Sequence, residues 1–319
     1  MENGGQSGIY SQHTRSPAAS GYGQPALTRL LLTLGAAVFD WGIIAATIWI
    51  AETLDNVWCR VAAIVVVASR QQALGVLAHE AIHWPKNSLR HTAILTLKYL
   101  CAWPILMEFE SFRRIHLAHH RHLNTDADPD FVRNRPADLV AANSLWQLVR
   151  YGLGLNRKHA GPSGILKMNG GMLILWGLTI TGLWYLGYVR LFLLYWVLPL
   201  FTWFIVLLRL RGILEHAGIK ANVQEKTRTV RGNPLSNFLF LPHNIGLHGE
   251  HHRNPQMPFF RLRGLKYPDA DWHTSRGVIS ASIEVLVATS WFSRSFKNKG
   301  IPEIRRIESV KVVNREPQA

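Results

Sequence analysis

Three short histidine-rich motifs are the part of this sequence whose residue types and spacing could do chemistry. They are His79-Glu-Ala-Ile-His83, His116-Leu-Ala-His119-His120 and His248-Gly-Glu-His251-His252. Residues i, i+3 and i+4 of a helix share one face, so each motif is expected to aim its imidazoles in one direction. Imidazole is the commonest metal ligand near neutral pH, and eight imidazoles are too many for one tetrahedral zinc. The motifs therefore predict a site for two metal ions.

The first motif has a second interpretation. Residues 79–83 also fit the H-E-x-x-H pattern of zinc metalloproteases, in which Glu80 would be the general base. A protease of this kind needs only one further ligand and leaves most of the clustered histidines unexplained, so we keep it as a remote alternative. A histidine-lined metal transporter would place its ligands on broken helices at the bilayer midplane, whereas these motifs lie at or beyond the ends of apolar segments.

Four apolar segments must position the motifs. About 20 apolar residues cross a hydrocarbon core of roughly 30 Å. The segments have 18 to 21 residues and are 30–50, 58–78, 172–189 and 191–208. A fifth stretch, 92–107, has only 16 residues and contains Lys98 and Pro104, so we expect it to dip into the membrane or to lie at its surface. The sequence thus predicts a mainly α-helical fold with four transmembrane helices.

The basic residues predict the orientation in the membrane. Of 35 Lys and Arg residues, 12 lie between residues 85 and 168 and 18 lie from residue 209 to the end. Loops rich in Lys and Arg stay in the cytoplasm. We therefore expect both termini to be cytoplasmic and a cytoplasmic helical cap to carry the dimetal site. The net charge of +15 follows from this orientation, and we predict no nucleic-acid partner.

Composition divides the chain into three parts. Residues 1–26 are rich in Gly, Ser and Gln, without the apolar core of a signal peptide, which predicts a disordered cytoplasmic tail. Residues 27–260 form the predicted membrane domain with the three motifs, and residues 261–319 form a basic cytoplasmic region. Cys59 and Cys101 are the only cysteines, which excludes a disulfide framework and an iron–sulfur cluster.

The motifs and their flanking residues resemble the integral-membrane fatty acid desaturase and hydroxylase superfamily. Residues 70–83 are similar to its first histidine box with the preceding helix. Residues 114–130 are similar to the second box, including Asp128-Pro129-Asp130, and residues 244–252 are similar to the third in its N-x-x-x-H-x-x-H-H form. The resemblance covers the chain from about Arg70 to Pro255.

This resemblance implies a non-haem centre of two Fe ions that activates O₂ and attacks an unactivated C–H bond. It also implies an external electron donor, such as a ferredoxin or a small b-type cytochrome with its reductase. The family pattern adds a ligand just after the fourth span, where Glu215-His216 stands, so His216 is the expected ninth ligand.

The order of the boxes is more similar to that of acyl desaturases, so we predict desaturation of an acyl, lipid-like chain. Related boxes occur in carotenoid ketolases and hydroxylases. Hydroxylation or ketolation of an acyl or isoprenoid chain at the same di-iron site is therefore the alternative. The expected location is the cytoplasmic membrane of a bacterium or the endoplasmic reticulum of a eukaryote.

Several polar residues near the motifs are candidates to orient the ligands. A metal-bound imidazole usually donates its other N–H to a carboxylate or carbonyl, which fixes the ring. The candidates are Glu80, Asp128, Asp130, Glu215, Glu250 and Asn244, and for each the alternative is a turn, surface or capping role. Asn244 could also hold a metal-bound water.

Other polar residues are expected to act elsewhere. Asp40 lies near the bilayer midplane, where we favour an ion pair with Arg70 over a contact with substrate. We expect His122 to face solvent and His243 to lie in a loop. The basic residues after Arg253 could dock an acidic electron carrier or attract anionic lipid. They include Arg261, Arg263, Lys266, Lys297 and Lys299.

Overall fold

The computed structural model describes residues 25–123, 125, 127–129, 168–217, 219, 227–265, 267 and 273–288. The described part of the chain is mainly helical, as predicted. The predicted tail lies almost wholly outside it, as do Asp130, His13, His159 and the lysines at 266, 297 and 299. Three helices in this part of the chain are long and apolar enough to cross a membrane: Ala26–Leu54, Val57–Ile82 and Val189–His216.

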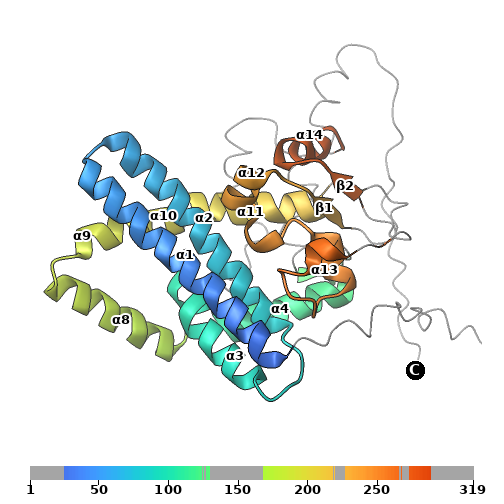
Figure 1. Ribbon diagram of the computed structural model, residues 1–319, viewed down its shortest axis with the longest axis horizontal. Coiled ribbons are helices and arrows are strands. Elements are labelled where there is room, and N and C mark those ends of the chain that lie inside the picture. The colour runs from blue at the N-terminus through green and yellow to red at the C-terminus, as the bar shows by residue number, and fades with distance from the viewer. Residues whose placement is uncertain are drawn as a thin grey trace, which may run out of the picture.

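The first two helices form an antiparallel hairpin (Figure 1). α1 covers Ala26–Leu54 and α2 covers Val57–Ile82. The turn between them uses a left-handed residue, Asp55, and Asn56 caps α2 by accepting from the N–H groups of Trp58 and Cys59. α2 is the central helix, because its C-terminal half from Val67 onward is buried. That half ends at the first histidine motif.

A buried ion pair joins α1 and α2. Nη1 of Arg70 lies 3.0 Å from Oδ1 of Asp40, and neither side chain is more than 3% exposed. The predicted pairing of these two residues is therefore confirmed. A charge inside a membrane domain is stabilised only when it is paired, and here the partner comes from the neighbouring helix.

The stretch predicted to dip into the membrane is sharply bent. α3 (Arg90–Leu97) continues through a π-helical turn, η2 (Lys98–Ala102), and a 3-10 turn, η3 (Trp103–Ile105). The chain then turns by 96° into α4 (Phe109–His122). Carbonyl groups at the bend accept hydrogen bonds from three indole N–H groups on other helices. These bonds satisfy the carbonyl groups without water and so stabilise the bend. The pairs are Trp41 with Leu100, Trp176 with Trp103, and Trp196 with Pro104.

The next helices differ from the predicted segments in length. α8 covers Gly170–Tyr185, so it has only 16 residues and ends before the predicted limit at residue 189. The following run is longer than predicted, because it continues past residue 208 to His216. It comprises α9 (Val189–Phe192), η6 (Leu193–Val197), α10 (Leu198–Phe201) and α11 (Trp203–His216). The polar end of α11 packs against β1 and α14, which explains the extension.

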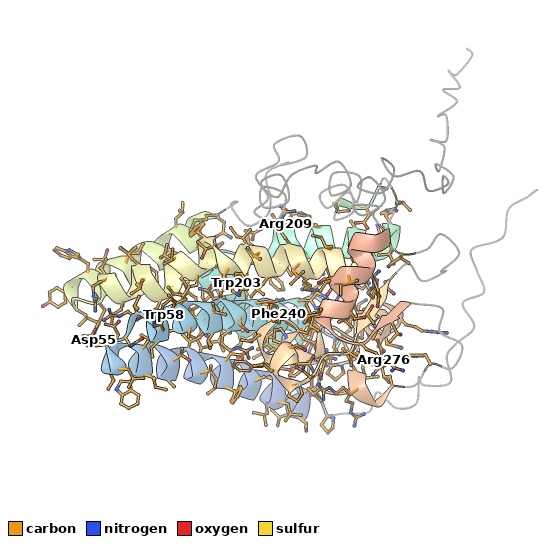
Figure 2. All side chains as sticks on the ribbon, turned by 90° about the horizontal axis from the view of Figure 1, so that it is seen from above. Asp55, Trp58, Trp203, Arg209, Phe240 and Arg276 are labelled. Carbon is orange, nitrogen blue, oxygen red and sulfur yellow. The ribbon has the colours of Figure 1, made fainter. Side chains whose placement is uncertain are left out.

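The remaining elements gather at one end of the helices (Figure 1). They are β1 (Arg228–Val230), α12 (Pro234–Leu239), η7 (Pro242–Asn244), α13 (His248–Arg253), η8 (Leu262–Gly264), β2 (His273–Ser275) and α14 (Val278–Ala288). β1 and β2 pair in parallel, with Thr229 opposite Thr274. Figure 2 places Asp55 and Trp58 at the opposite end of the molecule from Arg276. These elements, from β1 to α14, are called the cap below, and they lie far from the α1–α2 turn.

Candidate metal centre

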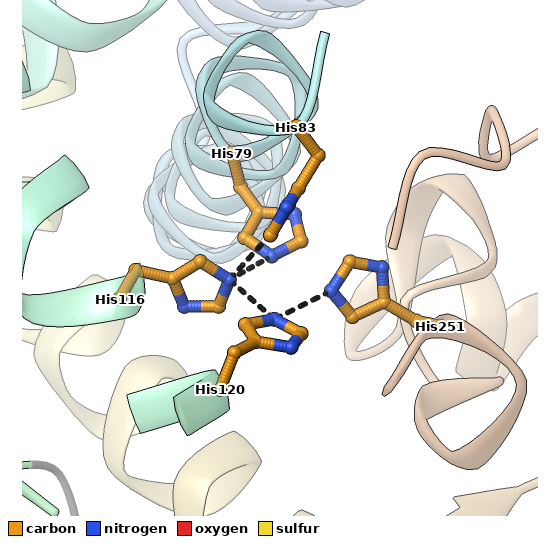
Figure 3. Close-up of side chains that lie close together, drawn as sticks. All are labelled: His79, His83, His116, His120 and His251. Carbon is orange, nitrogen blue, oxygen red and sulfur yellow. Dashed lines mark hydrogen bonds between the residues drawn. The ribbon is translucent and has the colours of Figure 1, made fainter. Parts of the chain in front are cut away.

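Nine histidines converge in two groups where α2, α4, α11 and α13 meet. In each group one ligand atom per residue lies within 4.8 Å of all the others. The first group is His79, His83, His116, His120 and His251, and the second is His119, His216, His248 and His252. Figure 3 shows the rings of the first group pointing toward one another from α2, α4 and α13. The structure thus brings together all nine predicted ligands.

The partition follows from helix geometry and corrects one expectation. We expected each motif to aim its imidazoles in one direction, but the second and third motifs each serve both groups. On α4, His116 and His120 join the first group while His119 joins the second. Positions i and i+4 lie nearly above one another on a helix, whereas i+3 is turned to the other side of that line. An H-x-x-H-H motif therefore divides its ligands between two neighbouring groups.

The third motif divides its histidines in the opposite sense. On α13, His251 joins the first group, and His248 and His252 join the second. Of the three motifs, only the first places all its histidines, His79 and His83, in the same group. Because α4 and α13 each contribute to both groups, the two groups are adjacent. The rings of His120 and His252, one from each group, are stacked with centroids 4.2 Å apart.

The Nε2 atoms are the ones that meet. In the first group, Nε2 of His116 lies 2.8 Å from Nε2 of His79 and 2.8 Å from that of His83. In the second, Nε2 of His248 lies 2.9 Å from that of His216 and 2.9 Å from that of His252. Converging imidazole nitrogens at these separations are an arrangement typical of a metal site.

Burial favours the neutral form of the three histidines of α13. Removal from water lowers the pKa of His248, His251 and His252 well below the ordinary value, and neighbouring imidazoles lower it further. A neutral imidazole has a lone pair for a metal, whereas a protonated one has none. Among the described residues, Nδ1 of His79 and of His248 is buried without a hydrogen-bond partner. Neutral, densely packed, partly unpartnered imidazoles fit two divalent metal ions, including iron.

One predicted carboxylate contacts a histidine of the second group. Both carboxylate oxygens of Asp128 lie within 3.0 Å of Nδ1 of His119, and Asp128 is completely buried. When Nδ1 donates to the carboxylate, Nε2 is left as the lone-pair atom that faces the second group. Asp128 therefore occupies the position expected of a residue that fixes ring and tautomer.

Other predicted carboxylates have different partners. Glu215 accepts from Nε of Arg211 at 2.7 Å, and its other oxygen lies 3.5 Å from Nε2 of His248. Glu80 has partners that belong to neither group: it pairs with Arg29 at 3.4 Å and accepts from the N–H of Phe259 at 3.3 Å. A protease base would face a metal-bound water, so the position of Glu80 gives the protease interpretation no support.

The other predicted polar residues that the structure describes belong to neither group. Asn244 donates to the carbonyl of Phe259 at 2.9 Å and accepts from Nε of Arg263 at 2.6 Å. His122 and His91 belong to neither group of histidines. His243 does lie in an irregular segment, as predicted, but it also has a buried partner, since its Nε2 is 2.7 Å from Oδ2 of Asp40.

β1, a strand that no sequence motif predicted, holds α13. On β1, Thr229 donates to Glu250 at 2.6 Å, and the adjacent Arg231 donates to the other oxygen of Glu250 at 2.6 Å. Glu250 stands inside the third motif, so these two contacts hold α13. Glu250 was a candidate to orient an imidazole, and the structure pairs it with Thr229 and Arg231 instead.

Arg228 on the same strand holds the end of α11. Its buried Nη1 donates to the carbonyls of Leu214 at 2.7 Å and Ala217 at 2.9 Å, on either side of His216. A guanidinium that binds the last carbonyls of a helix fixes the helix end, and the positive charge suits the negative pole of the helix. β1 thus positions both His216 and α13.

An apolar cavity lies among the long helices. Its volume is about 540 Å³, and it is lined by residues of α1, η2, α8, α9 and η6 that include Trp41, Tyr99, Trp176, Phe192 and Trp196. The rings of Trp41 and Trp196 are stacked with centroids 5.0 Å apart. The space suits an apolar molecule, because most of its lining is aliphatic or aromatic.

Comparison with known proteins agrees with this architecture. The 26% identity to the dihydrorhizobitoxine desaturase of Bradyrhizobium elkanii extends over 252 residues, which are 70% of this chain and 71% of that enzyme. A beta-carotene ketolase of a Paracoccus species is 28% identical over 251 residues, covering 74% of this chain and 94% of the ketolase. A ketolase of a second Paracoccus strain is 26% identical over 254 residues. The sequence profile described as fatty acid desaturase matches residues 56–273, which contain all nine histidines, and the chain therefore belongs to the fatty acid desaturase family of membrane oxidoreductases.

Proposed function

We propose that this protein is an O₂-dependent di-iron oxidase that desaturates a lipid-like acyl chain with electrons from an external donor. The observation that carries the proposal is the division of nine imidazoles, six buried and three partly buried, into groups of five and four, with the Nε2 atoms of each group close together. Five and four ligands on shared helices suit two adjacent metal ions. Family membership supports iron as the metal and oxidation as the reaction.

The reaction balances as follows. Two hydrogens leave a –CH₂–CH₂– unit of the substrate, and O₂, together with two electrons from the donor and two protons, becomes two molecules of water. The iron pair, when bound, supplies the activation of O₂ that makes an unactivated C–H bond reactive. The chain's own contribution is to hold that pair in a dry, fixed environment, with His119 oriented by Asp128 and His216 held by the Arg228 cap on α11.

The membrane topology is the second part of the proposal. His119 on α4 and His216 on α11 belong to one group, so both lie on the same side of the membrane. α8 begins where Asn169 donates to Glu108 at 3.3 Å, and the loop after it places Arg190 against Glu52 near the α1–α2 turn. We propose that α8 is the fourth span, that a thinned bilayer accommodates its 16 residues, and that both termini are cytoplasmic.

A long apolar substrate fits the position of the cavity. Arg29 of α1 contacts Glu80 within the first histidine motif, while Trp41, which lines the cavity, lies further along the same helix. Arg29 and Trp41 are twelve residues apart, and a rise of 1.5 Å per residue separates them by roughly 18 Å along α1. We propose that an acyl or isoprenoid chain from the bilayer occupies the cavity with one end while a carbon nearer its other end reaches the metal centre.

Hydroxylation or ketolation of an isoprenoid is the second candidate, and a specific observation favours it. Two of the relatives are named beta-carotene ketolases, and the matched ketolase segments cover 94% and 95% of those enzymes. The aromatic lining of the cavity suits a rigid conjugated chain as well as a flexible acyl chain. Both outcomes begin with removal of hydrogen, and the way the chain is held decides between them.

The electron donor is proposed to be a small acidic carrier, either a ferredoxin or a b-type cytochrome served by a reductase. Exposed guanidinium groups of Arg231, Arg261 and Arg263 lie in segments next to α13. Complementary charge steers such encounters. Attraction of this surface to anionic lipid is the alternative, and the two differ in whether raised salt slows electron delivery from a soluble carrier.

The test is expression under ¹⁸O₂ with a suitable donor, followed by mass spectrometry of lipids and isoprenoids. Desaturation predicts a product two mass units lighter than its substrate and without label. A product with one ¹⁸O atom in a hydroxyl or ketone group would replace desaturation by the second candidate. A product that forms equally without O₂ would exclude both, and peptide cleavage with a single bound zinc would revive the protease.

A further inference from the structure

The third histidine motif lies on a helix too short to hold its own direction. α13 has six residues, yet it supplies His251 to the first group and His248 and His252 to the second. Isolated helices of this length are not stable in water. The orientation of α13, and with it the geometry of both groups, must therefore come from contacts of the chain on either side.

The segment just before α13 has an unusual backbone. His243 and Asn244 are consecutive non-glycine residues with φ angles of 50° and 58°, both in the left-handed region. Residues with a Cβ atom are sparse there, and two in a row persist only where the surroundings hold them. The contacts of these residues therefore identify what determines the path of the chain into α13.

His243 is held by a carboxylate of α1. Its Nε2 lies 2.7 Å from Oδ2 of Asp40, which is fully buried, and the other carboxylate oxygen of Asp40 lies 3.0 Å from Arg70. The two carboxylate oxygens of Asp40 thus have different partners. Arg70 accounts for the charge of Asp40, while the contact with His243 connects α1 to a segment 203 residues away.

The rest of this segment follows the polar side of α2. Ser69 donates to the carbonyl of Phe238 at 2.7 Å, Gln72 donates to that of Phe240 at 3.1 Å, and Arg70 also donates to Phe238. Figure 2 places Phe240 beside the long helices, toward the end that carries the cap. These bonds explain why α2 carries polar residues within an apolar segment, and they bring His243 to Asp40.

The chain is fixed again immediately after His243. The carbonyl of Gly246 accepts from the N–H of Val230 at 2.7 Å, and a Cβ atom on Gly246 would stand 2.5 Å from the carbonyl oxygen of Val230. Only glycine allows this approach. With Asp40 on one side and β1 on the other, little freedom is left before His248.

We propose that Asp40 is a positioning residue for the metal centre: through its hydrogen bond to His243 it sets the direction of α13 and so the arrangement of the imidazoles in both groups. The inference rests on the proposed dimetal function. It extends that function by assigning a role to an intramembrane carboxylate and a histidine that belong to neither group of ligands in the described part of the chain.

The experiment compares His243→Gln, His243→Leu and Asp40→Asn in full-length purified protein loaded with Co²⁺. The readouts are the cobalt content and the visible absorption of the bound cobalt, which reports ligand geometry. The side-chain amide of the glutamine variant can replace Nε2 as a donor to Asp40, whereas leucine cannot. Both His243 variants leave the Asp40–Arg70 pair intact, so they remain informative where Asp40→Asn fails to fold.

We expect His243→Gln to keep the wild-type cobalt spectrum, and His243→Leu and Asp40→Asn to change it and to bind at least one of the two ions about tenfold more weakly. Glu52→Gln is the matched control, because Glu52 is also on α1 and joins it to Tyr195 at 2.7 Å, far from α13. It should lower thermal stability and leave the spectrum unchanged.

Three results would contradict the proposal in different ways. Wild-type protein that binds two ions, together with His243→Leu and Asp40→Asn variants whose cobalt content and spectrum match it, would overturn the positioning role alone. Wild-type protein that binds no cobalt and no iron would overturn the proposed function and this inference with it. A spectrum altered equally by Glu52→Gln would also overturn the inference, because it would mean that any weakened contact of α1 disturbs the site.

Discussion

Nδ1 of His119 lies 2.9 Å from Oδ2 of Asp128, and both side chains are almost completely buried. The carboxylate fixes the ring and its tautomer, so Asp128→Ala should weaken metal binding in the second group about 10- to 100-fold. His119 belongs to the second group alone, so the first group should keep its ion. Metal content after dialysis against graded chelator measures the difference.

The control for this variant is Glu110→Ala. Glu110 is also an acidic residue on α4, but it is exposed and paired with Arg113 at 3.6 Å. It should retain both ions at wild-type affinity. Equal metal loss in the Asp128 and Glu110 variants would mean that Asp128 has no special role at His119.

Two neighbouring histidines should give different defects. His120→Ala removes a ligand of the first group, and His119→Ala removes one of the second. Each variant should therefore lose chiefly one of two ions, although both should lose turnover by at least about 100-fold, because the reaction needs the pair. Iron content and Mössbauer spectra of the ⁵⁷Fe-loaded variants distinguish the two sites.

His91→Ala provides the comparison for both, since His91 is on α3 and in neither group. It should retain metal and activity. Full activity in His119→Ala would refute the dimetal interpretation, as would a single tightly bound zinc in the wild-type protein.

Arg228→Met should affect the second group selectively. The substitution removes the guanidinium that binds the carbonyls of Leu214 and Ala217, so the end of α11 is no longer capped and His216 becomes mobile. We expect the second ion to bind at least about tenfold more weakly, a lower melting temperature, and an unchanged first ion. Calorimetric metal titration of detergent-purified protein provides the measurement.

Arg276→Met tests whether loss of any positive charge in the cap has this effect. Arg276 is exposed in the short turn between β2 and α14. Its substitution should leave the affinities of both groups for their metal ions unchanged. Simultaneous loss of both ions from Arg228→Met, with the fold intact, would contradict the selective role.

Reporter fusions test the topology. Fusions after residues 57 and 189 should report a non-cytoplasmic position, and fusions after residues 124 and 319 a cytoplasmic one, because both groups of histidines need α4 and α13 on one side. α8 decides the outcome, since its 16 residues are fewer than a typical span. A cytoplasmic signal after residue 189 would show that α8 does not cross, and a non-cytoplasmic signal after residue 124 would separate α4 from α13.

Much of the site could be predicted because metal ligation depends on residue type and helical spacing, both visible in the sequence. His216 alone came from family resemblance and not from a motif of its own, and the structure places its Nε2 atom 2.9 Å from that of His248. The pair of Asp40 and Arg70 was also predictable, since an intramembrane charge needs a partner and few were available.

What could not be predicted depends on contacts between distant segments. Spacing alone did not reveal that His119 and His120 serve different groups, because that needs the positions of α2 and α11. Arg228 and Thr229 stand in a short polar stretch without periodicity, and only the packing of β1 against α11 and α13 gives them a role. His243 looked like a loop residue because its partner, Asp40, is 203 residues away.

Each H-x-x-H-H motif divides its histidines between two groups. The spacing of these histidines along the helix is therefore as important as their residue type. One residue inserted between His116 and His119 would rotate the later imidazoles by about 100° around α4, and neither group would then keep its ligands. The same holds on α13 between His248 and His251. Substitutions of Leu117 and Ala118, between His116 and His119, can be tolerated, whereas insertions and deletions cannot. Related chains with this centre should therefore vary in composition within the two motifs and never in their length.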